Sequence, residues 1–327
     1  MSRRENSTGS IYFRAMPDPL PGAARCLDAT AVNAALRRMA RSGQAPWLHG
    51  EVARRMAQRL EVVLLKPSRV IDWWGALGAG GALLDKAYPK AQRIVVEPTA
   101  AWLQHSRSAA HRPWWSAARW GGPAVETIAD EDAATLAPGV QLVWANMMLH
   151  AVVDPPALFA RWEQLLAVDG FVMFSCLGPG TLRELRALYA RLGWPAATPG
   201  FIDMHDLGDM LVRSGFADPV MDQETLVLHW ESPGALLAEL RSLGGNTAPG
   251  RFAGLRTPGW QRALESELSA LAGPDGRIAM SFEVAYGHAF KAAPRLRADA
   301  PTTVSLTDMR ALVRSSHDKG RAGRTLR

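Results

Sequence analysis

Acidic residues and glycines are spaced between Val70 and Pro98 in a way that could hold a ligand. Asp72 ends one short apolar run, and Glu97, 25 residues later, ends another. Four glycines stand between them, of which Gly75, Gly78 and Gly80 are the candidates for a ligand loop. A carboxylate in the position of Glu97 can accept hydrogen bonds from both hydroxyls of a ribose, and glycine lets a ligand approach the backbone because no Cβ intervenes. The segment therefore predicts the start of a βαβ unit that binds a nucleoside.

The glycine pattern indicates which cofactor such a unit would hold. The dinucleotide fingerprint GxGxxG is not met, because Leu83 stands where the third glycine should be, and this disfavours nicotinamide or flavin. The looser glycine loop of enzymes that use S-adenosylmethionine, a cofactor without a pyrophosphate, is the alternative. In such a unit Asp130, after a third strand, would meet the adenine amino group. Asn146, after a fourth strand, would either cap the strand end or contact the cofactor.

Two tryptophans, Trp73 and Trp74, stand in the turn where a cofactor loop usually has small residues. Their first interpretation is structural, with one indole in the core and the other against a covering helix. The second is that the indole of Trp74, whose volume is comparable to part of the cofactor, occupies cofactor space. The sequence leaves both interpretations open.

Strands that alternate with helices on short connections favour an open, doubly wound α/β sheet. Apolar runs predict strands at 70–72, 93–96, 125–130, 140–146, 171–177, 220–230 and 278–290. Helical spacing predicts N-terminal helices within 29–65, further helices at 155–167, at 181–192 and within 200–216, and a helical insert at about 233–277 before the last strand. We expect the last two strands to form a hairpin or to include an inserted antiparallel strand.

Composition sets the outer limits. With 327 residues, 48% of them hydrophobic and 21% charged, the chain is typical of a globular protein. Its two cysteines, Cys26 and Cys176, are far apart, so we expect a reduced, cytoplasmic protein without a disulfide framework and with no metal site. No run of apolar residues is long enough to span a membrane.

The net charge of +6 belongs entirely to the C-terminus, because residues 291–327 contain nine basic and three acidic residues. We expect a basic, disordered tail there and a flexible N-terminus at 1–26, flanking one domain at 27–290. The tail has no interleaved aromatic residues, which disfavours nucleic acid as a partner.

Several segments between Leu27 and Phe290 resemble the malonyl-acyl-carrier-protein O-methyltransferases of biotin synthesis, which are class I methyltransferases. The more specific of them are LVWANMMLHAVVDPPALFARWEQLLAVDGFVMFSCLGPGTLREL and FIDMHDLGDMLVRSGFADPVMDQETL. The resemblance implies a Rossmann-like sheet of seven strands, S-adenosylmethionine as cofactor, and a malonyl thioester on acyl carrier protein as substrate and partner. Together with the spacing described above, we predict that the cofactor is bound by Asp72, Gly75, Gly78, Gly80, Glu97, Asp130 and Asn146.

This chain departs from the family pattern in the glycine loop. The pattern D-x-G-x-G-x-G, laid on the chain from Asp72, places its glycines on Trp74, Ala76 and Gly78, and only the last is a glycine. A second hypothesis is therefore a methyltransferase-fold protein that has lost cofactor binding and acts as a scaffold or assembly factor, as the related complex I assembly factors do.

The expected reaction needs little acid or base machinery. A malonyl carboxylate is already ionised at neutral pH, with a reference pKa of about 4, so it needs no general base to become a nucleophile. A cation that steers the carboxylate would help, and Arg183 and Arg186, on the helix after LGPGT, are the candidates. His150, after the fourth strand, is the candidate on the substrate side.

Overall fold

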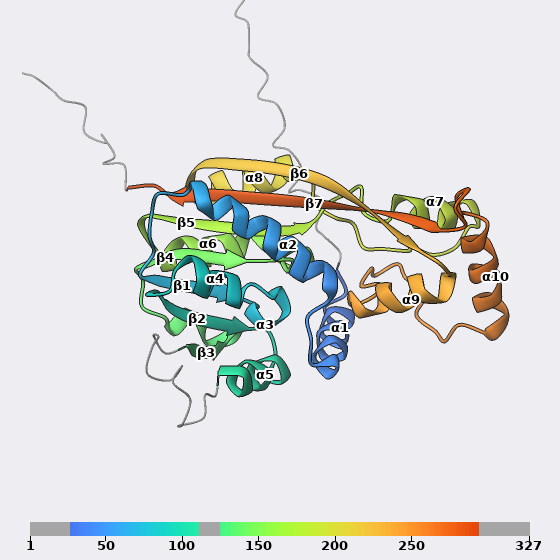
Figure 1. Ribbon diagram of the computed structural model, residues 1–327, viewed down its shortest axis with the longest axis horizontal. Helices are drawn as coiled ribbons and strands as arrows, with labels where there is room; N and C mark the ends of the chain where they lie inside the picture. The colour runs from blue at the N-terminus through green and yellow to red at the C-terminus, as the bar shows by residue number, and fades with distance from the viewer. Residues whose placement is uncertain (1–26, 111–124, 294–327) are drawn as a thin grey trace, which may run out of the picture. The chain divides into compact units, whose positions relative to one another are not determined.

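A mixed sheet of seven strands runs through the residues that the computed structural model describes, which are 27–110 and 125–293 (Figure 1). The strand order is β3-β2-β1-β4-β5-β7-β6. The strands are β1 (Arg69–Trp73), β2 (Gln92–Glu97), β3 (Glu126–Ala129), β4 (Val140–Ala145), β5 (Leu166–Leu177), β6 (Phe216–Trp230) and β7 (Ile278–Lys291). Apart from Ala293, the described residues belong to one compact unit that ends at Ala292. The predicted N-terminal segment 1–26 and all but the start of the predicted tail lie outside them.

The pairing of the strands confirms the predicted fold class. Strands β1 to β5 pair in parallel, whereas β7 pairs antiparallel with both β5 and β6. The antiparallel strand predicted near the C-terminus is thus β7, inserted between β5 and β6. The sheet is the doubly wound, Rossmann-like arrangement that the sequence predicts, with its N-terminal helices and with a helical insert before the last strand.

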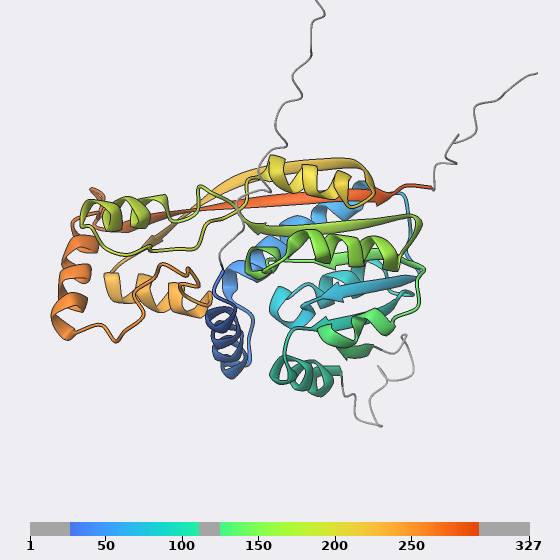
Figure 2. The same ribbon diagram turned by 180° about the vertical axis from the view of Figure 1, so that it is seen from behind.

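Helices cover both faces of the sheet. One face carries α2 (Trp47–Gln58) and α4 (Gly81–Ala87), and the other carries α6 (Pro155–Leu165) and α8 (Met204–Arg213) (Figure 1, Figure 2). The C-terminal end of β6 and the N-terminal end of β7 lie beside α7 (Arg183–Arg191), α9 (Pro233–Ser242) and α10 (Pro258–Ser269) (Figure 1). The other α-helices among the described residues are α1 (Ala29–Ser42), α3 (Gly75–Gly78) and α5 (Ala100–Ala110).

Local sequence signals set where several helices begin. The Asp28 carboxylate accepts hydrogen bonds from the backbone N–H groups of Thr30 and Ala31, which would otherwise lack partners at the start of α1. Asp154 caps α6 in the same way and is followed by proline, whose fixed φ suits the first helical position. These caps explain why the predicted helix starts agree well with the structure.

The boundary between α6 and β5 differs from the prediction. The sequence predicts a helix to Ala167 and a strand from Phe171, but α6 ends at Leu165 and β5 begins at Leu166. Asp169 has a left-handed φ of 63°, and the register between β4 and β5 shifts beside it. A bulge therefore lengthens the strand backward into what reads as helix.

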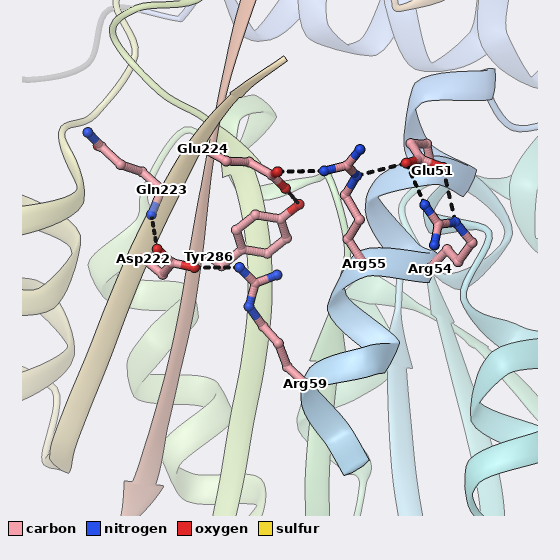
Figure 3. Close-up of polar contacts among 8 residues, drawn as sticks. All are labelled: Glu51, Arg54, Arg55, Arg59, Asp222, Gln223, Glu224 and Tyr286. Atoms are coloured by element: carbon pink, nitrogen blue, oxygen red, sulfur yellow. Dashed lines mark hydrogen bonds and ion pairs between the residues drawn. The ribbon is translucent and has the colours of Figure 1, made fainter. Parts of the chain in front are cut away.

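An arginine-paired network joins α2 to the β6–β7 pair (Figure 3). It consists of Glu51, Arg54, Arg55, Arg59, Asp222, Glu224 and Tyr286. Arg55 contacts Glu51 at 2.7 Å and Glu224 at 2.6 Å, and Glu224 also accepts a 2.5 Å hydrogen bond from the Tyr286 hydroxyl. The network fixes α2, whose first turn reaches the carboxyl edge of the sheet.

No helix among the described residues is both long and apolar enough to cross a membrane.

Candidate functional site

The predicted cofactor residues meet at the carboxyl edge of the parallel strands. Asp72, Glu97, Asp130 and Asn146 lie at or just after the ends of β1, β2, β3 and β4. Because neighbouring parallel strands end at the same edge, residues from Asp72 to Asn146 converge there despite their separation in the sequence. The structure thus brings together the set that the sequence singled out.

Glu97 is completely buried at the end of β2. Its Oε1 accepts hydrogen bonds from the Ala76 backbone N–H at 2.8 Å and from the Ser106 hydroxyl at 2.6 Å. Its Oε2 is buried and has no hydrogen-bond partner among the described residues. Burial raises the pKa of Glu97 to about 8 against the opposing effect of these two hydrogen bonds, so the carboxyl is largely protonated at neutral pH in this conformation.

Asp72 lies beneath the glycine turn and is also buried. Burial raises its pKa to about 6, and the Arg93 guanidinium, 3.4 Å away, acts in the opposite direction. A Cβ at position 75 would lie only 2.7 Å from the Asp72 carboxyl group, so Gly75 serves close packing of the turn onto Asp72. Asp72 thus supports the turn from below.

The two tryptophans point to different surroundings. Trp73 lies in the core, where its ring meets Trp162 edge-on at 5.8 Å. Trp74 has a left-handed backbone with φ 55°, and its indole Nε1–H donates a 3.0 Å hydrogen bond to Asp130. Asp130 also forms a 3.0 Å ion pair with Arg161. The sequence leaves two interpretations of Trp74. In the structure its indole is hydrogen bonded to Asp130, the carboxylate predicted to accept from adenine.

The glycine turn is a single helical turn, α3, held by the protein itself. The Asn146 amide donates to the carbonyls of Gly78 at 2.6 Å and His49 at 2.8 Å, and it accepts from the Ser175 hydroxyl at 2.7 Å. Gly78 packs on Asn146, since a Cβ there would lie 3.2 Å from the Asn146 carbonyl oxygen. Asn146 therefore anchors the turn, and each of its side-chain polar atoms is already hydrogen bonded.

His49 is a site residue that the sequence reasoning missed. Its Nδ1–H donates to the Leu77 carbonyl at 2.9 Å, which ties α2 to α3. Burial lowers the pKa of His49 to about 4, so the ring is neutral at physiological pH. The only available signal was a histidine on the otherwise apolar buried face of α2. Ser106, which bonds Glu97, gave no signal at all.

A cavity of about 390 Å³ adjoins the turn. Its wall includes Trp74, Leu77 and His49 beside the glycine turn and reaches α1, α7 and α9. Among the described residues, the Arg and Lys side chains that line it are Arg38 and Arg241. A second cavity of about 340 Å³ lies between α1 and α6 and is also lined by Trp74 and Asp130. The indole of Trp74 thus contributes to the walls of both cavities.

Of the three residues predicted to contact the substrate, one lines the larger cavity and two do not. His150 lines the larger cavity, and its ring accepts a 3.4 Å hydrogen bond from the Leu177 backbone N–H. Arg183 and Arg186 are not among the lining residues: Arg183 is exposed and pairs with Glu184, while Arg186 donates to the Pro179 carbonyl. Their neighbours Leu182 and Leu185 face the cavity instead.

The polar groups fit the nucleoside of S-adenosylmethionine in kind. Glu97 retains a buried acceptor atom without a partner, and Asp130 lies at the end of the next strand. In this conformation, however, the Trp74 indole donates a hydrogen bond to Asp130, and Glu97 is fully buried. The polar groups are present, and protein groups already donate to Asp130 and to Oε1 of Glu97. The described residues contain no group of three or more histidine, cysteine or acidic side chains that could hold a metal ion.

Comparison with known proteins gives a consistent set of relatives. A malonyl-[acyl-carrier protein] O-methyltransferase of Gallionella capsiferriformans is 38% identical over 260 residues, which are 79% of this chain and 88% of the relative. The same enzyme of Laribacter hongkongensis is 38% identical over 275 residues (83% and 92%), and that of Halorhodospira halophila is 34% identical over 273 residues (83% and 90%). No protein-family model matches the chain.

The solved structures support the fold. The YcgJ protein of Bacillus subtilis superposes with a TM-score of 0.50 at 12% identity, covering 73% of this chain and 99% of that protein. At such low identity the match concerns architecture alone. It agrees with the strand order described above.

Proposed function

Because this chain belongs to the malonyl-[acyl-carrier protein] O-methyltransferase family, we propose that it methylates the free carboxylate of a malonyl thioester on acyl carrier protein, in biotin synthesis. The structural observation that carries the proposal is the 390 Å³ cavity beside the glycine turn, at the edge where Glu97 and Asp130 converge. We assign this activity to the domain at 27–290 and expect it in the cytoplasm.

Glu97 and Asp130 are the residues we assign to the cofactor. Glu97 would accept hydrogen bonds from the ribose hydroxyls, and Asp130 would accept one from the adenine amino group. The turn at Gly75–Gly78, supported by Asp72 and Asn146, would carry the backbone that faces the cofactor. S-adenosylmethionine, when bound, supplies an electrophilic methyl group that the carboxylate oxygen takes, with the bonding pair left on sulfur.

The protein's own contribution to the reaction is positioning. The substrate carboxylate is ionised at neutral pH, so no general base is required, and the neutral His49 has no proton to remove from it. Apolar walls such as Leu77 and Phe282 exclude water from the cavity. Holding the two reactants in line can lower the barrier by up to roughly 7–11 kcal/mol in favourable cases.

Arg38 and Arg241, rather than Arg183 and Arg186, are the arginines that line the larger cavity among the described residues. Both line the cavity and both are exposed, so we place them at its mouth. We assign them to the phosphate of the carrier protein's phosphopantetheine arm, since arginine binds phosphate by charge-assisted hydrogen bonds. Steering of the carboxylate by Arg183 or Arg186 stays a prediction.

The test is methyl transfer with defined carrier substrates. The purified chain is incubated with S-adenosylmethionine and malonyl-acyl carrier protein, and the carrier is analysed by intact mass spectrometry. We expect one methyl ester per malonyl group, and none on acetyl-acyl carrier protein, which lacks a free carboxylate. Growth of a biotin auxotroph that lacks its own malonyl methyltransferase would report the same activity in cells. A folded protein that methylates neither carrier would contradict the proposal and favour the scaffold hypothesis.

A further inference from the structure

The side chain of Trp74 makes to Asp130 the hydrogen bond that a bound adenine would make. Asp130 stands after β3, where its carboxylate would accept from the adenine amino group, and in this structure it accepts from the indole N–H of Trp74 at 3.0 Å. Both donors are N–H groups on a flat aromatic system. The indole therefore satisfies the same acceptor with the same chemistry.

Protein groups also donate the hydrogen bonds that Glu97 would accept from a ribose. A ribose offers two hydroxyl donors, and here Oε1 of Glu97 accepts from the Ala76 backbone N–H and from the Ser106 hydroxyl. The other oxygen, Oε2, is buried without a partner among the described residues. A buried polar atom without a hydrogen-bond partner is costly, so the closed arrangement satisfies Glu97 only in part.

The backbone at Trp74 is held in a conformation that suits glycine better than tryptophan. Its φ of 55° lies in the left-handed region, which non-glycine residues rarely adopt. Two backbone hydrogen bonds hold Trp74 in this conformation. The Trp74 N–H donates to the Val96 carbonyl at 2.6 Å, and the Gly78 N–H donates to the Trp74 carbonyl at 2.8 Å. A strained residue that the surrounding structure holds in place is typical of functional sites.

Two cavities beside Trp74 offer space for its side chain to move. Trp74 lines both the 390 Å³ cavity and the 340 Å³ cavity, so rotation about its side-chain bonds can carry the indole away from Asp130. The rest of the turn need not move, because His49 and Asn146 hold it through the carbonyls of Leu77 and Gly78.

We propose that Trp74 is an internal occupant of the nucleoside position, and that S-adenosylmethionine binds only after the indole leaves Asp130. This inference rests on the proposed function, because it assumes that the site takes this cofactor. The apparent association constant for the cofactor then equals the intrinsic constant multiplied by the fraction of molecules in which the indole is displaced. Removing the indole abolishes this penalty.

The experiment compares the binding of S-adenosylhomocysteine to three proteins by isothermal titration calorimetry. The wild type is compared with Trp74→Gly, which removes the indole and suits the left-handed backbone, and with Trp73→Phe, a neighbouring indole that lines neither cavity. We expect Trp74→Gly to bind at least about tenfold more tightly than the wild type, as for an open fraction of one in ten or less. Trp73→Phe should bind as the wild type does.

Each other outcome has a distinct meaning. Equal affinity of the wild type and Trp74→Gly would overturn the inference and leave the proposed function standing. Weaker binding by Trp74→Gly would also overturn it, because the indole would then be part of the binding surface. No binding by any of the three folded proteins would overturn the inference and the use of this cofactor together. Trp74→Asn, which also tolerates the left-handed backbone, replaces Trp74→Gly if that variant does not fold.

A second measurement uses the unmodified side chain. The indole N–H resonance of Trp74 is identified in the NMR spectrum as the one missing from Trp74→Gly. We expect this resonance to shift when S-adenosylhomocysteine is added, because the bond to Asp130 is broken. A ligand that binds without moving this resonance would contradict displacement.

Discussion

Two groups of carboxylates in this protein differ in what neutralises them. In the arginine-paired network (Figure 3), each carboxylate has a guanidinium partner, and Arg54 holds the pKa of Glu51 below its usual range, with Arg55 acting in the same direction. Beneath the glycine turn, Asp72 and Glu97 are more deeply buried, and burial raises both pKa values. Of these two carboxylates, Asp72 alone forms an ion pair with an arginine among the described residues, at 3.4 Å.

The difference separates the structural role of the network from the binding role that we propose for Glu97. The network is complete without any ligand, because arginine, carboxylate and tyrosine satisfy one another. Glu97 is incomplete, since one of its oxygens has no hydrogen-bond partner among the described residues and the carboxyl is held largely protonated. Perturbed carboxylates at the edge of an α/β sheet are typical of binding sites. The following changes test whether the two groups differ in this way.

The largest effect is expected from Glu97→Gln. The amide offers one acceptor oxygen and no charge to the ribose hydroxyls, so we expect kcat/KM for methyl transfer to fall by about 100-fold or more. The matched change in the network, Glu224→Gln, should leave kcat/KM within about twofold, as surface substitutions usually do. Steady-state kinetics with malonyl-acyl carrier protein measures both. Equal losses in the two variants would erase the proposed distinction.

The second effect concerns the pH dependence of stability. The folded-state pKa of Glu97, about 8, lies above its ordinary value of 4.5, so the folded state binds the proton more tightly and stability falls as pH rises between these values. From pH 6 to pH 8 the loss is about 2 kcal/mol. Glu51 has the opposite sign, because its lowered pKa means that its contribution is lost as pH falls through that pKa.

Denaturant unfolding of the ligand-free protein at pH 6 and pH 8 tests this dependence. We expect Glu97→Gln to remove most of the loss on going to pH 8, while Glu51→Gln keeps it. Asp72 contributes little in this range, since its pKa of about 6 places most of its effect at lower pH. An unchanged pH dependence in Glu97→Gln would mean that this carboxyl is not held protonated.

The third effect distinguishes two kinds of arginine. Arg241 lines the cavity, whereas Arg55 is occupied by Glu51 and Glu224. We expect Arg241→Ala to raise KM for malonyl-acyl carrier protein about fivefold with kcat nearly unchanged, because a phosphate contact far from the reacting atoms contributes uniform binding. An unchanged KM would remove Arg241 from the carrier's path.

The smallest effect is expected from Arg55→Ala. Its ion pairs are partly exposed, so their loss should lower the free energy of unfolding by about 0.5–1 kcal/mol. The KM for the carrier should not change. Thermal melting together with kinetics checks both, and a raised KM would show that α2 contributes to carrier binding as well as to stability.

The sequence predicts the fold and half of the site for physical reasons. Short apolar runs predict the buried strands, and parallel strands end at the same edge of a sheet. Both facts together place Asp72, Glu97, Asp130 and Asn146 near one another. The partners of these residues could not be predicted, because they depend on side-chain rotamers across long separations. Trp74 reaches Asp130 over 56 positions, and Asn146 reaches the His49 carbonyl over 97. Arg183 and Arg186 were chosen by helix position, which does not say which face lines a cavity.

A crystal structure with S-adenosylhomocysteine bound is the most direct test of the central claim, that buried carboxylates at the sheet edge form a nucleoside site covered by Trp74. We expect the ribose hydroxyls within hydrogen-bond distance of Glu97 and the adenine amino group on Asp130. The indole of Trp74 should be turned away from Asp130. A nucleoside bound elsewhere, with the indole still donating to Asp130 and Glu97 still closed by Ala76 and Ser106, would contradict the account.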